Sequence, residues 1–148
     1  MSRFRWSNIP IPEGHVIPLV VGVTLDIWFP LKLVELLWLK HLFGWTLLFM
    51  GSLLAAWTAM TFKAMDFSKP TGIIDSGPYQ FSRNPMYIAW TMLYLGVTVL
   101  VNTWWLLIFL PAVIAFTHYI VVRQEEQKLE QRFGEEYREY CGRVRRYL

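Results

Sequence analysis

The chain of 148 residues contains a single cysteine, Cys141, and few charged residues. One cysteine excludes a disulfide within the chain, so packing and lipid contact must stabilise the fold. Charged residues make up 17% of the sequence, against about 25% in soluble domains, and 55% are hydrophobic. The chain also lacks a Cys/His cluster, a Walker loop and a Rossmann glycine pattern. These absences argue against a metal site, ATP binding and a soluble dinucleotide-binding fold.

Nothing in the sequence indicates a nucleic-acid partner. The formal net charge is only +3, no base-reading motif occurs, and the basic residues lie beside apolar segments, where anionic headgroups attract them. The N-terminal stretch does not read as a cleaved signal peptide, because Arg3 and Arg5 are followed by Pro10 and Pro12 without a small-residue cleavage site. Without an internal repeat, linker or low-complexity segment, residues 1–148 are expected to form one domain.

Long apolar runs dominate the sequence. Residues 42–62 carry no charged side chain and are long enough to cross about 30 Å of hydrocarbon as a helix. Residues 84–122 also lack Asp, Glu, Lys and Arg, and Asn102-Thr103 predicts a turn that divides them into two spans. A weaker span covers residues 16–30. The sequence therefore predicts an all-α fold, a polytopic transmembrane helical bundle of about four spans with a C-terminal helical tail.

The distribution of charge in the loops predicts the orientation. Four spans place both termini, the 63–83 loop and the 123–148 tail on the same side, which carries most of the Lys and Arg residues. By the positive-inside rule this side is cytoplasmic. The short chain favours a prokaryotic cytoplasmic membrane as its location.

Two polar segments adjoin the last two predicted spans. The 77–87 loop combines a Gly-Pro turn, two tyrosines and Arg83, and the tail continues the last span directly with Glu125 and Glu126. Carboxylates at the headgroup boundary are costly to desolvate and usually have partners. The predicted hairpin returns both acids to the face of the membrane where the loop lies. Two carboxylates, an arginine and aromatic rings suit a small zwitterionic ligand.

These two segments carry a family resemblance. The pairing of Gly-Pro-Tyr-(four residues)-Asn-Pro-Met-Tyr with a downstream Glu-Glu-x-x-Leu-x-x-x-Phe-Gly-x-x-Tyr-x-x-Tyr resembles the isoprenylcysteine carboxyl methyltransferase and phospholipid methyltransferase family. The resemblance covers residues 69–148. It implies an integral membrane methyltransferase that uses S-adenosylmethionine, with the cofactor held at the cytoplasmic face between loop and tail.

The resemblance also implies which residues form the site. Glu125 and Arg123 are the catalytic candidates: the carboxylate could act as general base toward an amine acceptor, and the guanidinium could orient a carboxylate acceptor. Asn84 stands where the family more often has histidine, so a base role at this position is open, whereas hydrogen bonding is retained. The residues expected to bind the cofactor are Thr71, Gly72, Ile73, Ile74, Tyr79, Arg83, Asn84, Pro85, Met86, Tyr87 and Glu126.

The acceptor and two rival functions stay open at this stage. A lipophilic acceptor entering from the bilayer could be a prenylated cysteine, a phospholipid, an isoprenoid or another hydrophobic compound. Sterol reductases, which bind a nicotinamide cofactor, carry a similar Arg-His-Pro-Asn-Tyr element, but Met86 and the tail pattern favour the methyltransferase. A non-catalytic lipid-binding membrane module is the second alternative. Asp26, inside a predicted span, could face the acceptor or bond to a neighbouring helix.

Overall fold

The computed structural model describes residues 13–63 and 72–147, and every regular element within them is a helix. The predicted all-α fold is thereby confirmed. In chain order the elements are α1 (Glu13–Trp28), α2 (Leu37–Lys63), the 3-10 turn η2 (Gly77–Gln80), α3 (Pro85–Val101), α4 (Trp104–Phe116), the π-helical segment η3 (Thr117–Val122), α5 (Arg123–Phe133) and α6 (Glu135–Arg143).

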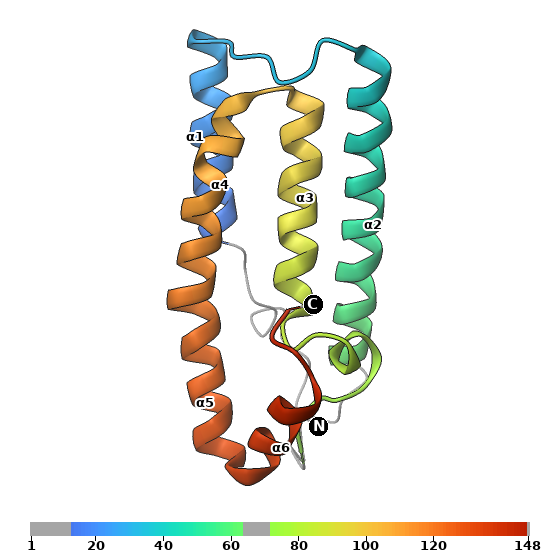
Figure 1. Cartoon of the computed structure of the whole chain (residues 1–148), viewed down its shortest axis with the longest axis vertical. Helices are drawn as coiled ribbons and strands as arrows, with labels where there is room; N and C mark the ends of the chain where they lie inside the picture. The colour runs from blue at the N-terminus through green and yellow to red at the C-terminus, as the bar shows by residue number, and fades with distance from the viewer. Residues whose placement is uncertain (1–12, 64–71, 148) are drawn as a thin grey trace.

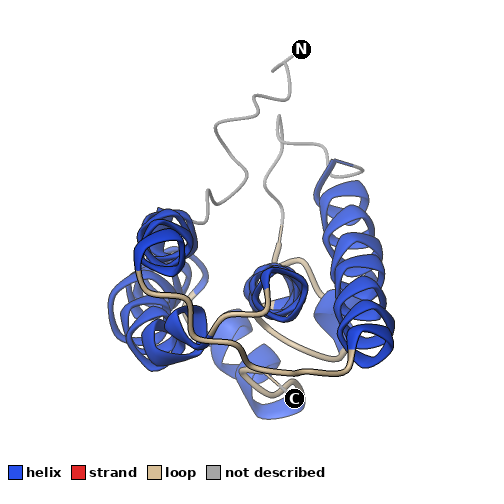
Figure 2. Ribbon diagram, turned by 90° about the horizontal axis from the view of Figure 1, so that it is seen from above, coloured by secondary structure: helices blue, strands red, loops and turns tan. Residues whose placement is uncertain are grey.

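The four longest elements form a bundle in which α3 is central. Figures 1 and 2 show α2 on one side of α3 and the α1–α4 pair on the other. The packing of α2 against α3 depends on small residues, because a Cβ atom at Gly96 would lie 3.0 Å from the backbone nitrogen of Leu48. Glycine at such a contact allows two helices to approach closely, as in many membrane bundles.

Two helices are long and apolar enough to cross a membrane, Leu37–Lys63 and the continuous helix Trp104–Phe133. The other two members of the bundle, α1 and α3, are shorter apolar helices of 16 and 17 residues. Large apolar side chains such as Trp28, Trp38 and Phe49 are exposed, as expected of surfaces that lipid covers. The count of four spans stays a prediction.

Asn102 and Thr103 form the tight turn between α3 and α4, at the position that the sequence predicts. Asn102 has a left-handed backbone, with φ 64°, and its side chain reaches the α1–α2 loop. Its Oδ1 accepts hydrogen bonds from the backbone nitrogens of Leu33 and Val34 at 3.2 and 2.8 Å, and its Nδ2 donates to the Val34 oxygen at 2.8 Å. One side chain therefore ties both connections at this end of the bundle together.

We expect Asn102→Ala to destabilise the fold by about 3 kcal/mol, because it removes three hydrogen bonds and places alanine in a left-handed conformation. Asn102→Gly removes the same hydrogen bonds, but glycine adopts the left-handed conformation without steric cost. Its loss of folding free energy should therefore be smaller by up to about 1 kcal/mol. Unfolding in detergent, followed by tryptophan fluorescence, compares the two variants. Equal losses of unfolding free energy in the two variants would show that the left-handed conformation at residue 102 adds nothing to the destabilisation by alanine.

Candidate functional site

The candidate site lies at the opposite end of the bundle, where η2, the start of α3, α5 and α6 meet (Figure 1). Gly77 has φ 59°, and a Cβ atom there would lie 2.5 Å from Thr61 Oγ1, so glycine allows η2 to pack against the end of α2. Pro78 is buried in this turn. The hydroxyl of Tyr140 donates a hydrogen bond to the backbone oxygen of Tyr79 at 2.8 Å. The Gly-Pro-Tyr segment is thus held between α2 and α6.

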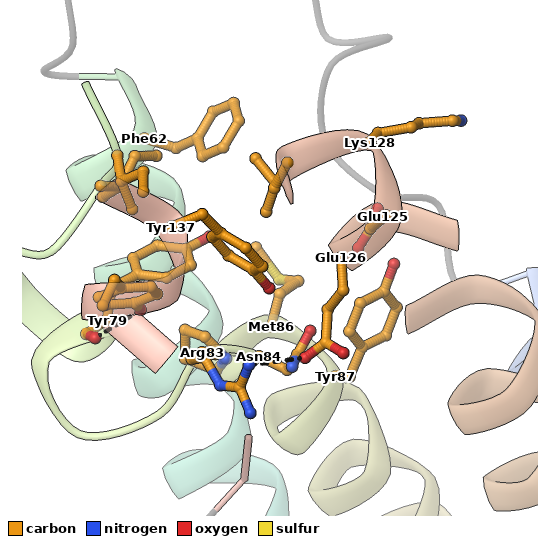
Figure 3. Close-up of a pocket in the computed structure, with 15 residues that line it drawn as sticks. Phe62, Tyr79, Arg83, Asn84, Met86, Tyr87, Glu125, Glu126, Lys128 and Tyr137 are labelled. Atoms are coloured by element: carbon orange, nitrogen blue, oxygen red, sulfur yellow. Dashed lines mark hydrogen bonds and ion pairs between the residues drawn. The ribbon is translucent and has the colours of Figure 1, made fainter. Parts of the chain in front are cut away.

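A cavity of about 310 Å³ opens between these elements, a volume at the lower end of the range for small-molecule sites. It brings together residues from the loop, from the start of α3 and from α5 (Figure 3). Ten of the residues expected from the sequence line it: Ile73, Ile74, Tyr79, Arg83, Asn84, Pro85, Met86, Tyr87, Glu125 and Glu126.

Three expected site residues are not among the lining residues. Thr71 lies outside the described residues. Gly72 adjoins the cavity through Ile73, whose backbone nitrogen donates a hydrogen bond to Glu136 Oε1 at 3.1 Å and so ties the loop to α6. Arg123 is exposed, and its guanidinium carbon lies 4.9 Å from the centre of the Tyr119 ring. Its direction from the helix therefore separates Arg123 from the cavity that Glu125 lines.

Asp26 has no part in this cavity. It lies near the end of α1 that Figure 1 shows at the far end of the bundle from α6. Its Oδ1 accepts a hydrogen bond from the backbone nitrogen of Leu31 at 3.3 Å, within the α1–α2 connection. This local bond corresponds to neither of the two roles considered from the sequence.

Glu126 is held by two arginines. Its Oε1 lies 3.2 Å from Arg83 Nη1, and the Arg146 guanidinium binds both of its oxygens, with Nε–Oε1 3.0 Å and Nη2–Oε2 2.8 Å. The side chains of Arg83 and Glu126 are only 14% and 13% exposed. Arg83 Nη1 also donates to Cys141 Sγ, whereas its buried Nε has no partner among the described residues. Because two guanidiniums share one carboxylate, the cluster keeps a net positive charge.

Glu125 has a different environment, although it is the neighbouring residue. It lies past the apolar part of its helix, and no ion pair is formed by it within the described part of the chain. Burial raises the pKa of the Glu125 carboxyl, against smaller opposite effects of the Tyr87 hydroxyl and the Lys128 charge. Figure 3 shows the Tyr87 ring rising from α3 toward α5, where its hydroxyl approaches the Glu125 carboxyl. Glu125 is therefore the carboxylate available to a ligand.

Two tyrosines of α6 form a wall of the cavity. The sequence analysis predicted a helical tail here but did not include these two residues in the site. Tyr137 and Tyr140 are 4% and 3% exposed and pack with Ile73 and Phe133. Burial raises the pKa of Tyr140 to about 12 and also raises that of Tyr79 and Tyr137. These phenols therefore stay neutral, so each offers an aromatic surface and a hydroxyl that is able to donate a hydrogen bond, as Tyr140 does to Tyr79. Both α6 tyrosines belong to the tail motif, and that motif was the signal that could have identified them.

The remaining lining residues were also missed: Phe62, Lys128 and Leu129. Leu129 follows Glu125 by four positions on α5, a spacing that places two helical residues on one face, so it could have been predicted. Phe62 comes from the end of α2, more than 60 residues from Glu125 along the chain, and no spacing in the sequence connects them.

The C-terminal segment, residues 144–147, returns to the loop before α3. The backbone nitrogen of Arg83 donates to the Arg145 oxygen at 2.9 Å, and the side chains of Ser82 and Asn84 donate to the Arg146 oxygen at 3.3 and 3.1 Å. The Tyr147 hydroxyl lies 2.9 Å from His118 Nδ1. Asn84 thus uses its amide to bind the C-terminal segment, a role that requires hydrogen bonding rather than titration.

A family model described as phospholipid methyltransferase matches residues 39–136, about two thirds of the chain. The match spans α2, the loop, α3, α4 and α5, and therefore most residues of the cavity. No curated protein and no solved structure matches the chain significantly. Within the described residues no group of three or more His, Cys, Asp or Glu side chains could hold a metal ion.

Proposed function

Because this chain belongs to the phospholipid methyltransferase family, we propose that it transfers a methyl group from S-adenosylmethionine to a lipophilic acceptor at the membrane. The observation that carries the proposal is the cavity at the end of an apolar bundle, which the half-buried Glu125, aromatic side chains and the positively charged Arg83 line together. The protein is accordingly a methyltransferase of the membrane, and its acceptor carries an amine or a carboxylate near the headgroup level.

The chemistry of the cavity residues fits this cofactor. Tyr79 and Tyr87 offer aromatic faces to a sulfonium cation, which such rings attract. Arg83 has an unpartnered buried Nε and can pair with the methionyl carboxylate. The backbone of residues 72–74 and the side chain of Asn84 are the candidates for the nucleoside part. Glu126 acts through Arg83, since its own oxygens are already bound by two guanidiniums.

When bound, S-adenosylmethionine supplies a methyl group whose carbon–sulfur bond breaks, with its electron pair left on sulfur, as the acceptor's lone pair forms the new bond. The protein's contribution to such a step is alignment, which can supply several kcal/mol. Toward an amine acceptor, as in a phospholipid-like headgroup, Glu125 accepts the proton that the methylated nitrogen releases. A carboxylate acceptor, as in an isoprenylcysteine-like molecule, releases no proton and needs no base.

The positive-inside rule supports a cytoplasmic position for the cavity. Seven basic residues lie in α5, α6 and the C-terminal segment, at the end of the bundle where the cavity opens: Arg123, Lys128, Arg132, Arg138, Arg143, Arg145 and Arg146. The opposite connection between α1 and α2 carries only Lys32 within residues 29–36. This orientation places an acceptor of the inner leaflet next to the cavity.

Calorimetry on the detergent-solubilised protein tests the cofactor. We expect S-adenosylmethionine and its demethylated product to bind in the micromolar range, and Arg83→Lys to weaken binding by about tenfold, because lysine keeps the charge but loses bidentate pairing. Arg143→Lys, at an exposed position outside the cavity, is the matched control. Binding of NADPH alone would support a reductase instead. Failure of both cofactors to bind a folded sample would leave a non-catalytic membrane module.

A further inference from the structure

Residues 144–147 return from α6 to the site, although they lie outside the part of the chain that the family model matches. Val144 is 9% exposed and packs with the two α6 tyrosines that form a wall of the cavity. At the other end of the segment, the Tyr147 hydroxyl lies 2.9 Å from Nδ1 of His118 in η3. The segment is therefore anchored at both ends, to α6 and to the helix that continues into α5.

The middle of this segment is bonded to three successive residues of the loop before α3. The backbone nitrogen of Arg83 donates to the Arg145 oxygen at 2.9 Å. The side chains of its two neighbours, Ser82 and Asn84, both donate to the Arg146 oxygen. These bonds hold the backbone around Arg83 against residue 146, so the Arg146 side chain begins from a fixed position beside the loop.

From this position Arg146 binds Glu126 side-on. Its Nε and Nη2 atoms lie 3.0 and 2.8 Å from the two carboxylate oxygens, and such a bidentate pair adds geometric specificity to the attraction of the charges. Arg83 meets the same carboxylate through one atom, with Nη1 3.2 Å from Oε1. The orientation of Glu126 is therefore determined by Arg146, and Arg83 contacts only one of its oxygens.

This arrangement leaves one edge of Arg83 for a ligand. In Arg83 the contacts with Glu126 and Cys141 both use Nη1, and the buried Nε has no partner among the described residues. A guanidinium can bind a carboxylate side-on through Nε and Nη2, as Arg146 does. Without Arg146, the Glu126 carboxylate could turn and take both oxygens to this edge of Arg83, where it would compete with a carboxylate of the ligand.

We propose that Arg146 is a positioning residue, which keeps the Nε edge of Arg83 free for the methionyl carboxylate and so sets the preference of the site for a methyl donor with a carboxylate. This inference rests on the proposed function, which it deepens. Arg146 is not among the residues that line the cavity, so it acts through Glu126 and Arg83 and not through contact with the ligand.

Calorimetry on the full-length protein in detergent, with S-adenosylmethionine and with decarboxylated S-adenosylmethionine, tests this role. The second ligand keeps the sulfonium and the ammonium group and lacks only the carboxylate. We expect the wild type to prefer S-adenosylmethionine by about tenfold or more, as for a hydrogen bond to a charged group, and Arg146→Gln to reduce this affinity ratio to about threefold or less. Glutamine keeps the backbone hydrogen bond of residue 146.

Two further variants separate paired hydrogen bonding from charge. Arg143→Gln removes the same charge from an exposed position that pairs with Asp75 at 3.7 Å, and it should keep the wild-type ratio. Arg146→Lys keeps the charge but loses the bidentate geometry, so its ratio should lie between those of the wild type and Arg146→Gln. An equal reduction by Arg143→Gln, or a wild-type ratio in Arg146→Lys, would overturn the role, because net charge would then explain the effect.

The comparison of the two ligands also excludes a merely structural effect. If Arg146→Gln weakened both ligands by the same factor, the residue would only stabilise the fold and the inference would be wrong. An unchanged ratio in Arg146→Gln would also overturn the inference, whereas the proposed function would stand on the binding of S-adenosylmethionine by the wild type. Absence of that binding in a folded wild-type sample would contradict the proposed function and, with it, the role of Arg146.

Discussion

The Glu126→Ala variant should lose about 3 kcal/mol of folding free energy, because removal of one partner from a mostly buried ion pair leaves the other charges uncompensated. Arg83 and Arg146 both depend on this carboxylate, and the side chains of Arg83 and Glu126 are 14% and 13% exposed. Without Glu126 the two guanidiniums repel one another at the edge of the cavity. We therefore expect S-adenosylmethionine binding to be lost together with stability.

Glu130→Ala is the matched control for this effect. Glu130 lies on the same helix, one turn further on, and also pairs with an arginine, Arg138, but the two side chains are 49% and 64% exposed. Solvent screens exposed pairs of this kind, so we expect a far smaller loss of folding free energy than for Glu126→Ala. Unfolding of both variants in the same detergent gives the comparison. Similar losses in the two would mean that the Glu126 cluster is solvated and contributes little to the fold.

The Glu125→Gln variant should reduce methyl transfer to an amine acceptor by about 10²–10⁴-fold, the usual contribution of a general base. Glutamine keeps the shape of the side chain and its ability to accept a hydrogen bond, so the affinity for S-adenosylmethionine should change by less than about threefold. Transfer of labelled methyl groups to phosphatidylethanolamine vesicles, at saturating cofactor, measures the rate. Parallel losses of binding and rate would instead assign Glu125 to the cofactor.

The pH dependence supplies an independent test of the same role. A general base must be deprotonated, so the rate falls as the pH decreases through its pKa. Since burial raises the pKa of Glu125, this acid limb should lie above the usual range of a glutamate, and Glu125→Gln should abolish it. A limb that persists in the glutamine variant would belong to another group and would exclude Glu125 as the base.

The sequence by itself determined the features that depend on short stretches of chain. Apolar runs long enough to span hydrocarbon form helices, because a helix pairs its backbone N–H and C=O groups within a single segment. This requirement predicts the all-α fold. Asn102 tolerates the left-handed backbone, which located the α3–α4 turn. The loop and tail motifs likewise indicated the family, because each is a local pattern of residue types.

Only the tertiary structure decided how neighbouring residues divide their roles. Glu125 and Glu126 are equivalent in the sequence, yet one faces the cavity and the other is bound by Arg83 and Arg146, because successive side chains on a helix point about 100° apart. The same rotation separates Arg123 from the cavity that Glu125 lines. The return of residues 144–147 to the loop depends on hydrogen bonds between segments about 60 residues apart, and the free energy of such contacts comes from packing in three dimensions, which leaves no periodic signal in the sequence.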